Sequence, residues 1–257
     1  MKRFFLIFLF LLQPALAFSA VKTETVEYKQ GESVLEGYLA YDDATQDKRP
    51  GILVVHEWKG LGPYAKMRAE QLAAMGYVAF AADIYGKGVR PQTHEDAAKQ
   101  AGIYKNDRSL MRERAKAGLD VLSGHPLGDG RLATIGYCFG GTTALELARS
   151  GADLKGVVSF HGALATPSPG DAKNIKARVL ALHGADDPYV PAAEVEAFKK
   201  EMTDGGVDYQ FVAYPGAVHS FTVPDAGNDP TKGAAYNADA DAQSWKAMQE
   251  FLKEIFK

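Results

Sequence analysis

The sequence is poor in cysteine, with a single one, Cys138, among its 257 residues. One cysteine cannot form an intrachain disulfide, which excludes a small scaffold held together by disulfides. Excess charge is also lacking: 29 Lys and Arg against 32 Asp and Glu give a formal net charge of −3, and no basic cluster stands out. Neither nucleic acid nor an anionic membrane surface is therefore expected as a partner, and a small molecule is the favoured ligand.

A hydrophobic run long enough to span a bilayer as a helix is missing near the start, where the unbroken apolar run covers only residues 4–12. Two basic residues precede this run, and small residues follow it around Ala17 and Ala20. A packed core helix is the alternative, but the run carries no polar face. We therefore predict a cleaved signal peptide over residues 1–20, a periplasmic or secreted protein, and no membrane contact after cleavage.

The rest of the sequence, residues 21–257, is predicted to form one α/β domain. Short apolar runs alternate with stretches of helical periodicity, after an expected hairpin of residues 25–29 and 34–40. The expected strands are residues 51–56, 77–82, 131–137, 156–161, 178–183 and 208–214. The expected helices are residues 64–75, 96–104, 109–122, 142–149, 192–203 and 238–255. Strands without a polar face predict a mostly parallel sheet with helices on both faces.

The single cysteine lies between one of these strands and the next helix, within the sequence Gly136-Tyr137-Cys138-Phe139-Gly140. The pattern G-x-C-x-G is that of a nucleophile elbow, a sharp turn in which glycines allow close backbone approach. The following helix would direct its N–H groups and positive end at the turn, which favours a thiolate. The alternative is that Cys138 is a small buried hydrophobe, the common fate of a free cysteine.

An acid and a base follow the cysteine in the chain order of an α/β-hydrolase triad. Asp187 follows the strand expected at 178–183, and His219 follows the strand expected at 208–214. Each residue alone has a plain interpretation as a turn or loop residue. Together with the elbow, they predict that Asp187 orients the imidazole of His219, which moves protons to and from Cys138.

With these motifs the sequence resembles the dienelactone hydrolase family of α/β-hydrolases, over nearly the whole chain after residue 20. The matching segments are His56-Glu57-Trp58-Lys59-Gly60, Ala82-Asp83-Ile84-Tyr85, the elbow at 136–141, residues 187–191 and residues 219–221. The resemblance implies an α/β-hydrolase fold and hydrolysis of carboxylic esters or lactones through a Cys-His-Asp triad and a thioester. It also implies that Glu57 approaches the resting thiol, and that the main-chain N–H groups of Trp58 and Phe139 form the oxyanion hole.

Substrate contacts are where the sequence departs from the family pattern. Members that open dienelactones hold the substrate carboxylate with two arginines, one after the Asp-x-Tyr segment and one after the catalytic histidine. Here the first region, after Tyr85, offers Lys87 and Arg90, and the second has Val223. Tyr85, Lys87 and Arg90 are the candidate substrate contacts. A lysine does not reproduce an arginine fork, so acceptance of an anionic lactone stays open.

No metal ion and no organic cofactor is expected. His56, His161 and His183 each lie at a strand end, but their spacing does not suggest a metal site, and we interpret them as structural or pocket-lining residues. Two alternatives to the ester or lactone hydrolase remain open. One is a non-catalytic ligand-binding or thiol-sensing module on the same fold, and the other is a broader acyl hydrolase or peptidase.

Overall fold

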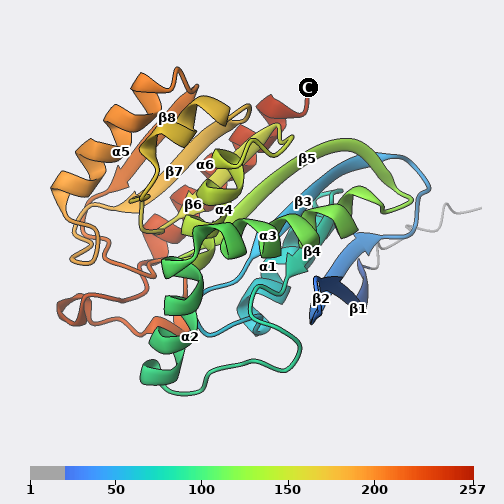
Figure 1. Cartoon of the computed structure of the whole chain (residues 1–257), viewed down its shortest axis with the longest axis horizontal. Coiled ribbons are helices and arrows are strands. Elements are labelled where there is room, and N and C mark those ends of the chain that lie inside the picture. The colour runs from blue at the N-terminus through green and yellow to red at the C-terminus, as the bar shows by residue number, and fades with distance from the viewer. Residues whose placement is uncertain (1–20) are drawn as a thin grey trace, which may run out of the picture.

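The computed structural model describes residues 21–257, and the signal peptide predicted over residues 1–20 lies outside the described residues. Helices cover both faces of a sheet (Figure 1), which confirms the predicted fold class. The strands are β1 (Val21–Gln30), β2 (Ser33–Asp42), β3 (Arg49–Val55), β4 (Val78–Ala82), β5 (Gly128–Tyr137), β6 (Gly156–Phe160), β7 (Arg178–Gly184) and β8 (Tyr209–Tyr214). The α-helices are α1 (Pro63–Ala74), α2 (His94–Asn106), α3 (Arg108–Ser123), α4 (Phe139–Arg149), α5 (Ala192–Asp204) and α6 (Ala238–Ile255).

The described residues form an eight-stranded sheet in the order β1-β2-β4-β3-β5-β6-β7-β8. The hairpin strand β2 runs antiparallel to both β1 and β4, and every pairing from β4 to β8 is parallel. Since parallel strands end at the same edge, the loops after β3, β5, β6, β7 and β8 meet there. The elbow, the acid and the base all lie in those loops.

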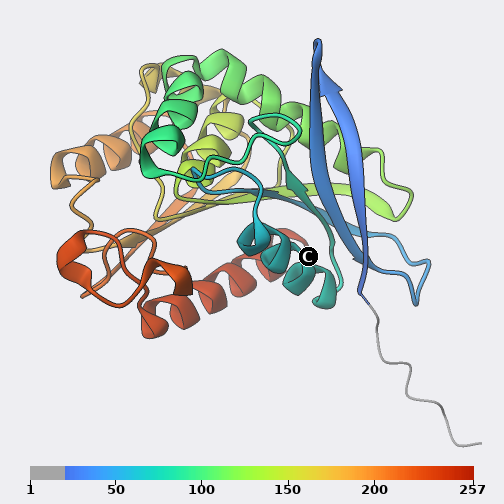
Figure 2. The same cartoon turned by 90° about the horizontal axis from the view of Figure 1, so that it is seen from below.

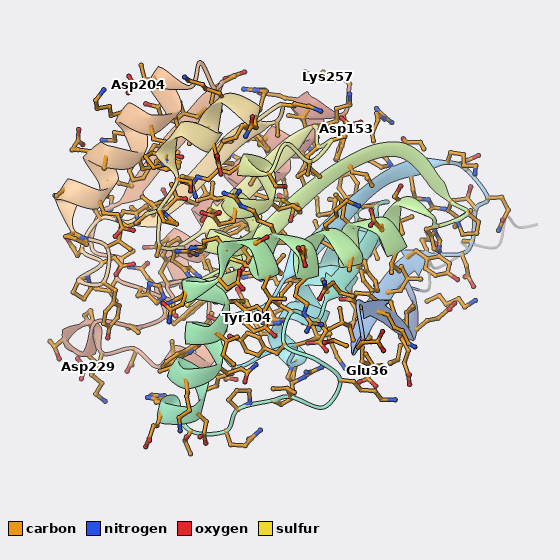
Figure 3. The ribbon with its side chains drawn as sticks, in the orientation of Figure 1. Glu36, Tyr104, Asp153, Asp204, Asp229 and Lys257 are labelled. Carbon is orange, nitrogen blue, oxygen red and sulfur yellow. The ribbon has the colours of Figure 1, made fainter. Side chains whose placement is uncertain are left out.

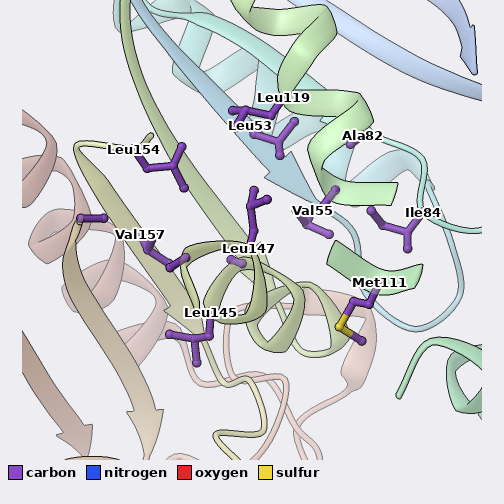
Figure 4. Packing of buried hydrophobic residues seen from close by; sticks show 14 of the residues in the cluster. Leu53, Val55, Ala82, Ile84, Met111, Leu119, Leu145, Leu147, Leu154 and Val157 are labelled. Carbon is purple, nitrogen blue, oxygen red and sulfur yellow. The ribbon is translucent and has the colours of Figure 1, made fainter. Parts of the chain in front are cut away.

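The core is divided in two by the sheet, because successive side chains of a strand point to opposite faces. On β3, Leu53 and Val55 pack with α3 and α4 on one face, while Ile52 and Val54 pack with α1 and α6 on the other. Figure 4 shows the first cluster around Leu53 and Val55, and Figure 2 shows α1 and α6 together on the opposite face. Burial on both faces explains why the strand sequences lack a polar side.

The predicted elements are all present, but their ends differ. The hairpin strands β1 and β2 extend beyond the predicted 25–29 and 34–40. Helix α4 begins at Phe139 rather than at residue 142, because the chain turns from strand to helix at Cys138 itself. Three short 3₁₀ helices lie in the loops after β6 and β8, namely η1 (Pro169–Asn174), η2 (Pro224–Ala226) and η3 (Pro230–Lys232).

None of the helices within residues 21–257 is both long and apolar enough to cross a membrane.

Candidate active site

The turn from β5 into α4 has the geometry of a nucleophile elbow. Cys138 adopts φ 54° and ψ −115°, outside the regions that non-glycine residues favour. A Cβ at Gly136 would lie 2.0 Å from the carbonyl oxygen of Gly140, and one at Gly140 would lie 2.2 Å from that of Val55. Both contacts are shorter than any side chain tolerates, so the two glycines of the G-x-C-x-G pattern are required by close packing of the main chain.

Strained backbone concentrates at this edge of the sheet. Within residues 21–257, the non-glycine residues with positive φ are Cys138, His161 and Ser220, at φ 54°, 40° and 55°. His161 directly follows β6, and Ser220 lies in the loop after β8. Such conformations persist only where the surrounding structure fixes them, and they cluster at functional sites. The backbone therefore points to the same edge as the sequence motifs.

The three residues predicted as a triad lie in hydrogen-bond contact. His219 Nε2 is 3.0 Å from Cys138 Sγ, and His219 Nδ1 is 2.8 Å from Asp187 Oδ2. The second carboxylate oxygen of Asp187 accepts the main-chain N–H of Tyr189 at 2.8 Å, which fixes the orientation of the carboxylate. The Asp187 side chain is fully buried, whereas that of His219 is 14% exposed. The base is thus held from one side and reachable from the other.

The histidine of this group favours its charged form. Burial by itself lowers the pKa of His219, but the charge of Cys138 and hydrogen bonds with Asp187 and Cys138 raise it to about 10 overall. A buried imidazolium needs a hydrogen-bond acceptor beside each ring nitrogen, and Asp187 and Cys138 occupy those two positions. The imidazole therefore lies between the carboxylate of Asp187 and the sulfur of Cys138, and its protonated form is favoured.

Glu57 follows β3 and lies beside the triad without touching the thiol. Burial raises the pKa of its carboxyl group to about 7, although His219, Lys59 and a hydrogen bond with Ser220 oppose that rise. Within the described part of the chain, the carboxyl makes no hydrogen bond to Cys138. The structure therefore brings Glu57 next to His219 and Ser220, and gives it a carboxyl that exchanges its proton near neutral pH.

Tyr85 contacts the two residues whose N–H groups are predicted to form the oxyanion hole. Its hydroxyl donates to the carbonyl oxygen of Trp58 at 2.9 Å, and its ring lies 5.2 Å from that of Phe139. The hydroxyl of Tyr104, labelled in Figure 3, donates to the carbonyl oxygen of Tyr85 at 3.1 Å. Phe139 is the first residue of α4, and the first four N–H groups of a helix have no intrahelical acceptor. Its N–H is thus oriented by the helix and lies next to the thiol.

The chain as a whole matches a known protein family. The model of the dienelactone hydrolase family matches residues 35–256. The chain belongs to the dienelactone hydrolase family. It is similar to the solved structure m3DLH, with 42% identity, a TM-score of 0.89, and coverage of 93% of this chain and 100% of that one. It is also similar to a dienelactone hydrolase-like promiscuous phosphotriesterase from metagenomic libraries, with 41% identity, a TM-score of 0.88 and the same coverage.

A putative carboxymethylenebutenolidase from Synechocystis is 26% identical over 255 residues, which are 92% of this chain and 98% of the relative. Membership of the dienelactone hydrolase family makes the chain a hydrolase that acts on ester or lactone bonds, which confirms the predicted enzyme class. The fold comparisons agree, since the described chain superposes on both solved relatives over almost its full length.

In this member of the dienelactone hydrolase family, Lys87 and Arg90, the cations predicted as substrate contacts, are bound to other groups of the protein. Lys87 forms an ion pair with Glu27 of β1. Arg90 donates to the carbonyl oxygens of Leu61, Gly86 and Val89 and pairs with Asp83 at 3.5 Å. The structure therefore does not present either side chain as a free cation. The apolar side chain of Val223, at the position of the second arginine, is buried.

The histidines outside the triad have structural contacts. The N–H of Ile84 donates to His56 Nε2 at 3.2 Å, and His56 Nδ1 lies 2.6 Å from the carbonyl oxygen of Glu57, so His56 ties the ends of β3 and β4 together. His183 is buried against Phe211. His161 contacts Cys138 and His219 directly. Within residues 21–257, no group of three or more His, Cys, Asp or Glu residues has the spacing to hold a metal ion.

The sequence did not single out Tyr189, which also belongs to the site. Its ring is 59% exposed and stands edge-on against that of His219, at 5.4 Å and 90°. Its hydroxyl reaches the carbonyl oxygen of Lys232, in the loop before α6 that carries Asp229 in Figure 3. An exposed aromatic ring beside the base is a ready contact for an apolar substrate group. Only its place two residues after Asp187 could have suggested this role.

Replacement of Glu57 by glutamine should stabilise the fold at high pH and not at low pH. With a pKa of about 7 in the folded chain against 4.5 ordinarily, the folded state binds the proton more tightly than the unfolded state. Stability is therefore lost as pH rises from 4.5 to 7, by up to about 3 kcal/mol. Chemical denaturation of Glu57→Gln should show a gain of up to about 3 kcal/mol at pH 8 and none at pH 4.

The matched control is Glu196→Gln, which changes an exposed carboxylate on α5. Its effect on the free energy of unfolding should be small at both pH values. Equal effects of Glu57→Gln at pH 4 and pH 8 would contradict a carboxyl destabilised by burial.

Proposed function

We propose that the protein hydrolyses neutral carboxylic esters or lactones by acyl transfer through Cys138, His219 and Asp187. The observation that carries this proposal is the contact chain of the site, with Sγ 3.0 Å from Nε2 and Nδ1 2.8 Å from Asp187. The Cys138 thiolate attacks the carbonyl carbon and forms a C–S bond. The tetrahedral intermediate then collapses, the C–O bond to the leaving group breaks, and His219 gives its proton to the leaving oxygen.

Water completes the cycle. Neutral His219 takes a proton from water, and the hydroxide attacks the thioester carbon. The C–S bond breaks, the acid leaves, and the thiolate is restored beside the imidazolium. In both halves the negative oxygen of the tetrahedral intermediate is stabilised by the N–H groups of Trp58 and Phe139, which the contact of His56 Nδ1 with the Glu57 carbonyl oxygen and the start of α4 hold in place.

Glu57 is assigned the role of a proton acceptor for the thiol. A carboxyl with a pKa near 7 is able to gain and lose a proton at neutral pH. In the substrate-free site its partner is Ser220, so contact with Cys138 requires a movement of the carboxyl when substrate binds. The rise of its pKa through burial supports this role, because a carboxylate of higher pKa holds the proton that it takes from the thiol more firmly.

A neutral substrate is favoured by the charges around the site. Lys87 and Arg90 are bound to protein groups, and the carboxyl of Glu57 lies beside the nucleophile. A substrate carboxylate would lose its hydration without gaining a contact with either of these two cations, which costs binding energy. Trp58 and Tyr189 offer aromatic surface instead.

The test is a substrate panel built around one matched pair, a carboxylate-bearing lactone and its methyl ester. We expect kcat/KM for the neutral compound to be at least about tenfold higher, since the two differ mainly in an unpaired charge. A small aryl ester and a peptide complete the panel. The anionic lactone as best substrate would overturn the preference, the peptide as best substrate would favour the peptidase alternative, and thiol labelling without any turnover would favour a thiol sensor.

Neutral phosphotriesters are a second candidate substrate class. The observation that favours them is the 41% identity to a promiscuous phosphotriesterase. The same thiolate would attack phosphorus and form a P–S bond, the P–O bond to the leaving group would break as His219 protonates the departing alcohol, and water would then cleave the P–S bond to release the phosphodiester. Turnover of a phosphotriester that disappears in Cys138→Ala would support this activity, and turnover that survives in that variant would count against it.

We also infer export of the mature chain from the signal peptide predicted over residues 1–20. Fractionation of cells expressing the full chain, followed by mass spectrometry of the product, tests this. A cytosolic product that retains residue 1 would overturn it.

A further inference from the structure

His161 lies between the nucleophile and the loop of the base. The residue is fully buried and has φ 40°. The main-chain N–H of Cys138 is shared between two acceptors, the carbonyl oxygen of Phe160 at 3.0 Å and His161 Nδ1 at 3.1 Å, and His161 Nε2 lies 2.8 Å from Thr222 Oγ1. A main-chain N–H can only donate, so Nδ1 carries no proton and Nε2–H donates to Thr222. The two contacts fix a single neutral tautomer of His161.

Two helices, α1 and α6, hold Thr222, the hydrogen-bond partner of His161 Nε2, in place. Tyr64 of α1 donates its hydroxyl to Thr222 Oγ1 at 2.7 Å, and Arg68 Nε donates to the Tyr64 hydroxyl at 3.1 Å. Arg68 also forms an ion pair with Asp241 of α6 at 2.6 Å. Thr222 is fully buried. The hydrogen-bond acceptor of His161 is therefore held by elements on the opposite face of the sheet from α4.

The same side chain also contacts the base. The rings of His161 and His219 lie 5.4 Å apart at 66°, and Thr222 follows His219 by three residues in the same loop. Cys138 and His161 both have positive φ, as does Ser220 between His219 and Thr222. One imidazole thus joins the strained elbow to the strained loop of the base.

We propose that His161 is a positioning residue: its Nδ1 orients the Cys138 main chain and thereby sets the contact between Sγ and His219. The proposal rests on the proposed nucleophilic role of Cys138. His161 takes no proton from substrate and acts only through the elbow. Misplacement of reacting atoms by about 1 Å is enough to slow a reaction about 100-fold, so a fixed elbow has a direct effect on the rate of acylation.

Neutrality of His161 is part of this arrangement. Burial, and the neighbouring charge of His219, lower its pKa well below the ordinary value. The other charged groups near it are Arg68 on α1 and His183 on β7, which act in the same direction. A protonated His161 would lose its acceptor and place a second cation beside the imidazolium of His219.

Two amide substitutions separate the two contacts of His161. Asn places its oxygen near the position of Nδ1 and tolerates positive φ, so His161→Asn keeps an acceptor for the Cys138 N–H. Gln places its amide near the position of Nε2, so His161→Gln keeps only the contact with Thr222. We expect His161→Asn to retain kcat for a small aryl ester within about threefold, and His161→Gln to lose at least about tenfold in kcat with KM nearly unchanged.

A purely structural role predicts a different pattern, in which both variants lose activity in proportion to their melting temperatures. A kcat of His161→Gln equal to that of the parent protein would overturn the proposal. Equal losses of kcat in His161→Gln and His161→Asn would also overturn it. If His161→Gln does not fold, Thr222→Val, which removes the acceptor of Nε2–H, is compared with Thr222→Ser, which keeps it. We then expect a loss of at least about threefold in kcat for the valine variant alone, and equal kcat in the two overturns the proposal.

Failure of the proposed function is distinguished by Cys138→Ala in the same assay. Turnover that survives this substitution removes the nucleophilic role of Cys138 itself. Turnover that depends on Cys138 but is indifferent to His161 leaves the proposed function intact and rejects only the positioning role.

Discussion

The Cys138→Ala variant should hydrolyse a small activated ester at least about 10⁴-fold more slowly than the parent protein, because removal of a triad nucleophile leaves only the contribution of binding and the oxyanion hole. The reason lies in the contact of Sγ with His219 Nε2 at 3.0 Å. Steady-state kinetics with an aryl ester measure the loss, with the melting temperature recorded alongside.

The matched control for this substitution is Cys138→Ser, which keeps a nucleophilic side chain of nearly the same size. A serine hydroxyl is far less acidic than a thiol and forms the nucleophilic alkoxide much less readily beside His219, so activity should fall strongly but not to the level of the alanine variant. Equal turnover by Cys138→Ala and the parent protein would mean that Cys138 is only a small buried hydrophobe, the alternative that the sequence left open.

Replacement of Asp187 by asparagine should lower kcat by about 10³- to 10⁴-fold with little change in KM. Asp187 Oδ2 accepts from His219 Nδ1 at 2.8 Å and so keeps the other ring nitrogen directed at the thiol. An asparagine can donate from its NH₂ group to that nitrogen, which stabilises the wrong tautomer. It also removes the carboxylate that stabilises the imidazolium.

The neighbouring carboxylate supplies a matched control. Asp186 is exposed, and its Oδ2 accepts the main-chain N–H of Gly216 at 3.0 Å rather than a hydrogen bond from His219. Asp186→Asn should keep kcat within about threefold, as expected for a surface substitution. Equal losses in the two variants would show that the loop, and not the Asp187 carboxylate, matters.

The sequence predicts the fold and the triad because both depend on local patterns. Residues 51–56 and 131–137 carry apolar side chains on both faces, and burial between two helical layers explains that pattern. Gly136 and Gly140 are required by main-chain contacts at the turn that they flank. Asp187 and His219 follow strands that end at one edge, so sequence order alone brings them near the elbow.

The substrate contacts could not be predicted in the same way, because they depend on partners far along the chain. Lys87 forms its ion pair with Glu27, sixty residues earlier on β1. Arg90 is taken up by carbonyl groups whose positions follow from the path of the loops. The role of His161 depends on the meeting of β5 and β6. None of these contacts has a signature in the sequence around the residue concerned.

The central claim is that Cys138 becomes acylated during hydrolysis. Intact-mass spectrometry of the protein, quenched during turnover of a slowly deacylated neutral ester, tests it most directly. We predict a mass increase equal to the acyl group, located on Cys138, lost when the ester is consumed, and missing in Cys138→Ala. Turnover by the parent protein with no adduct at any time, together with unchanged turnover in Cys138→Ala, would contradict the account.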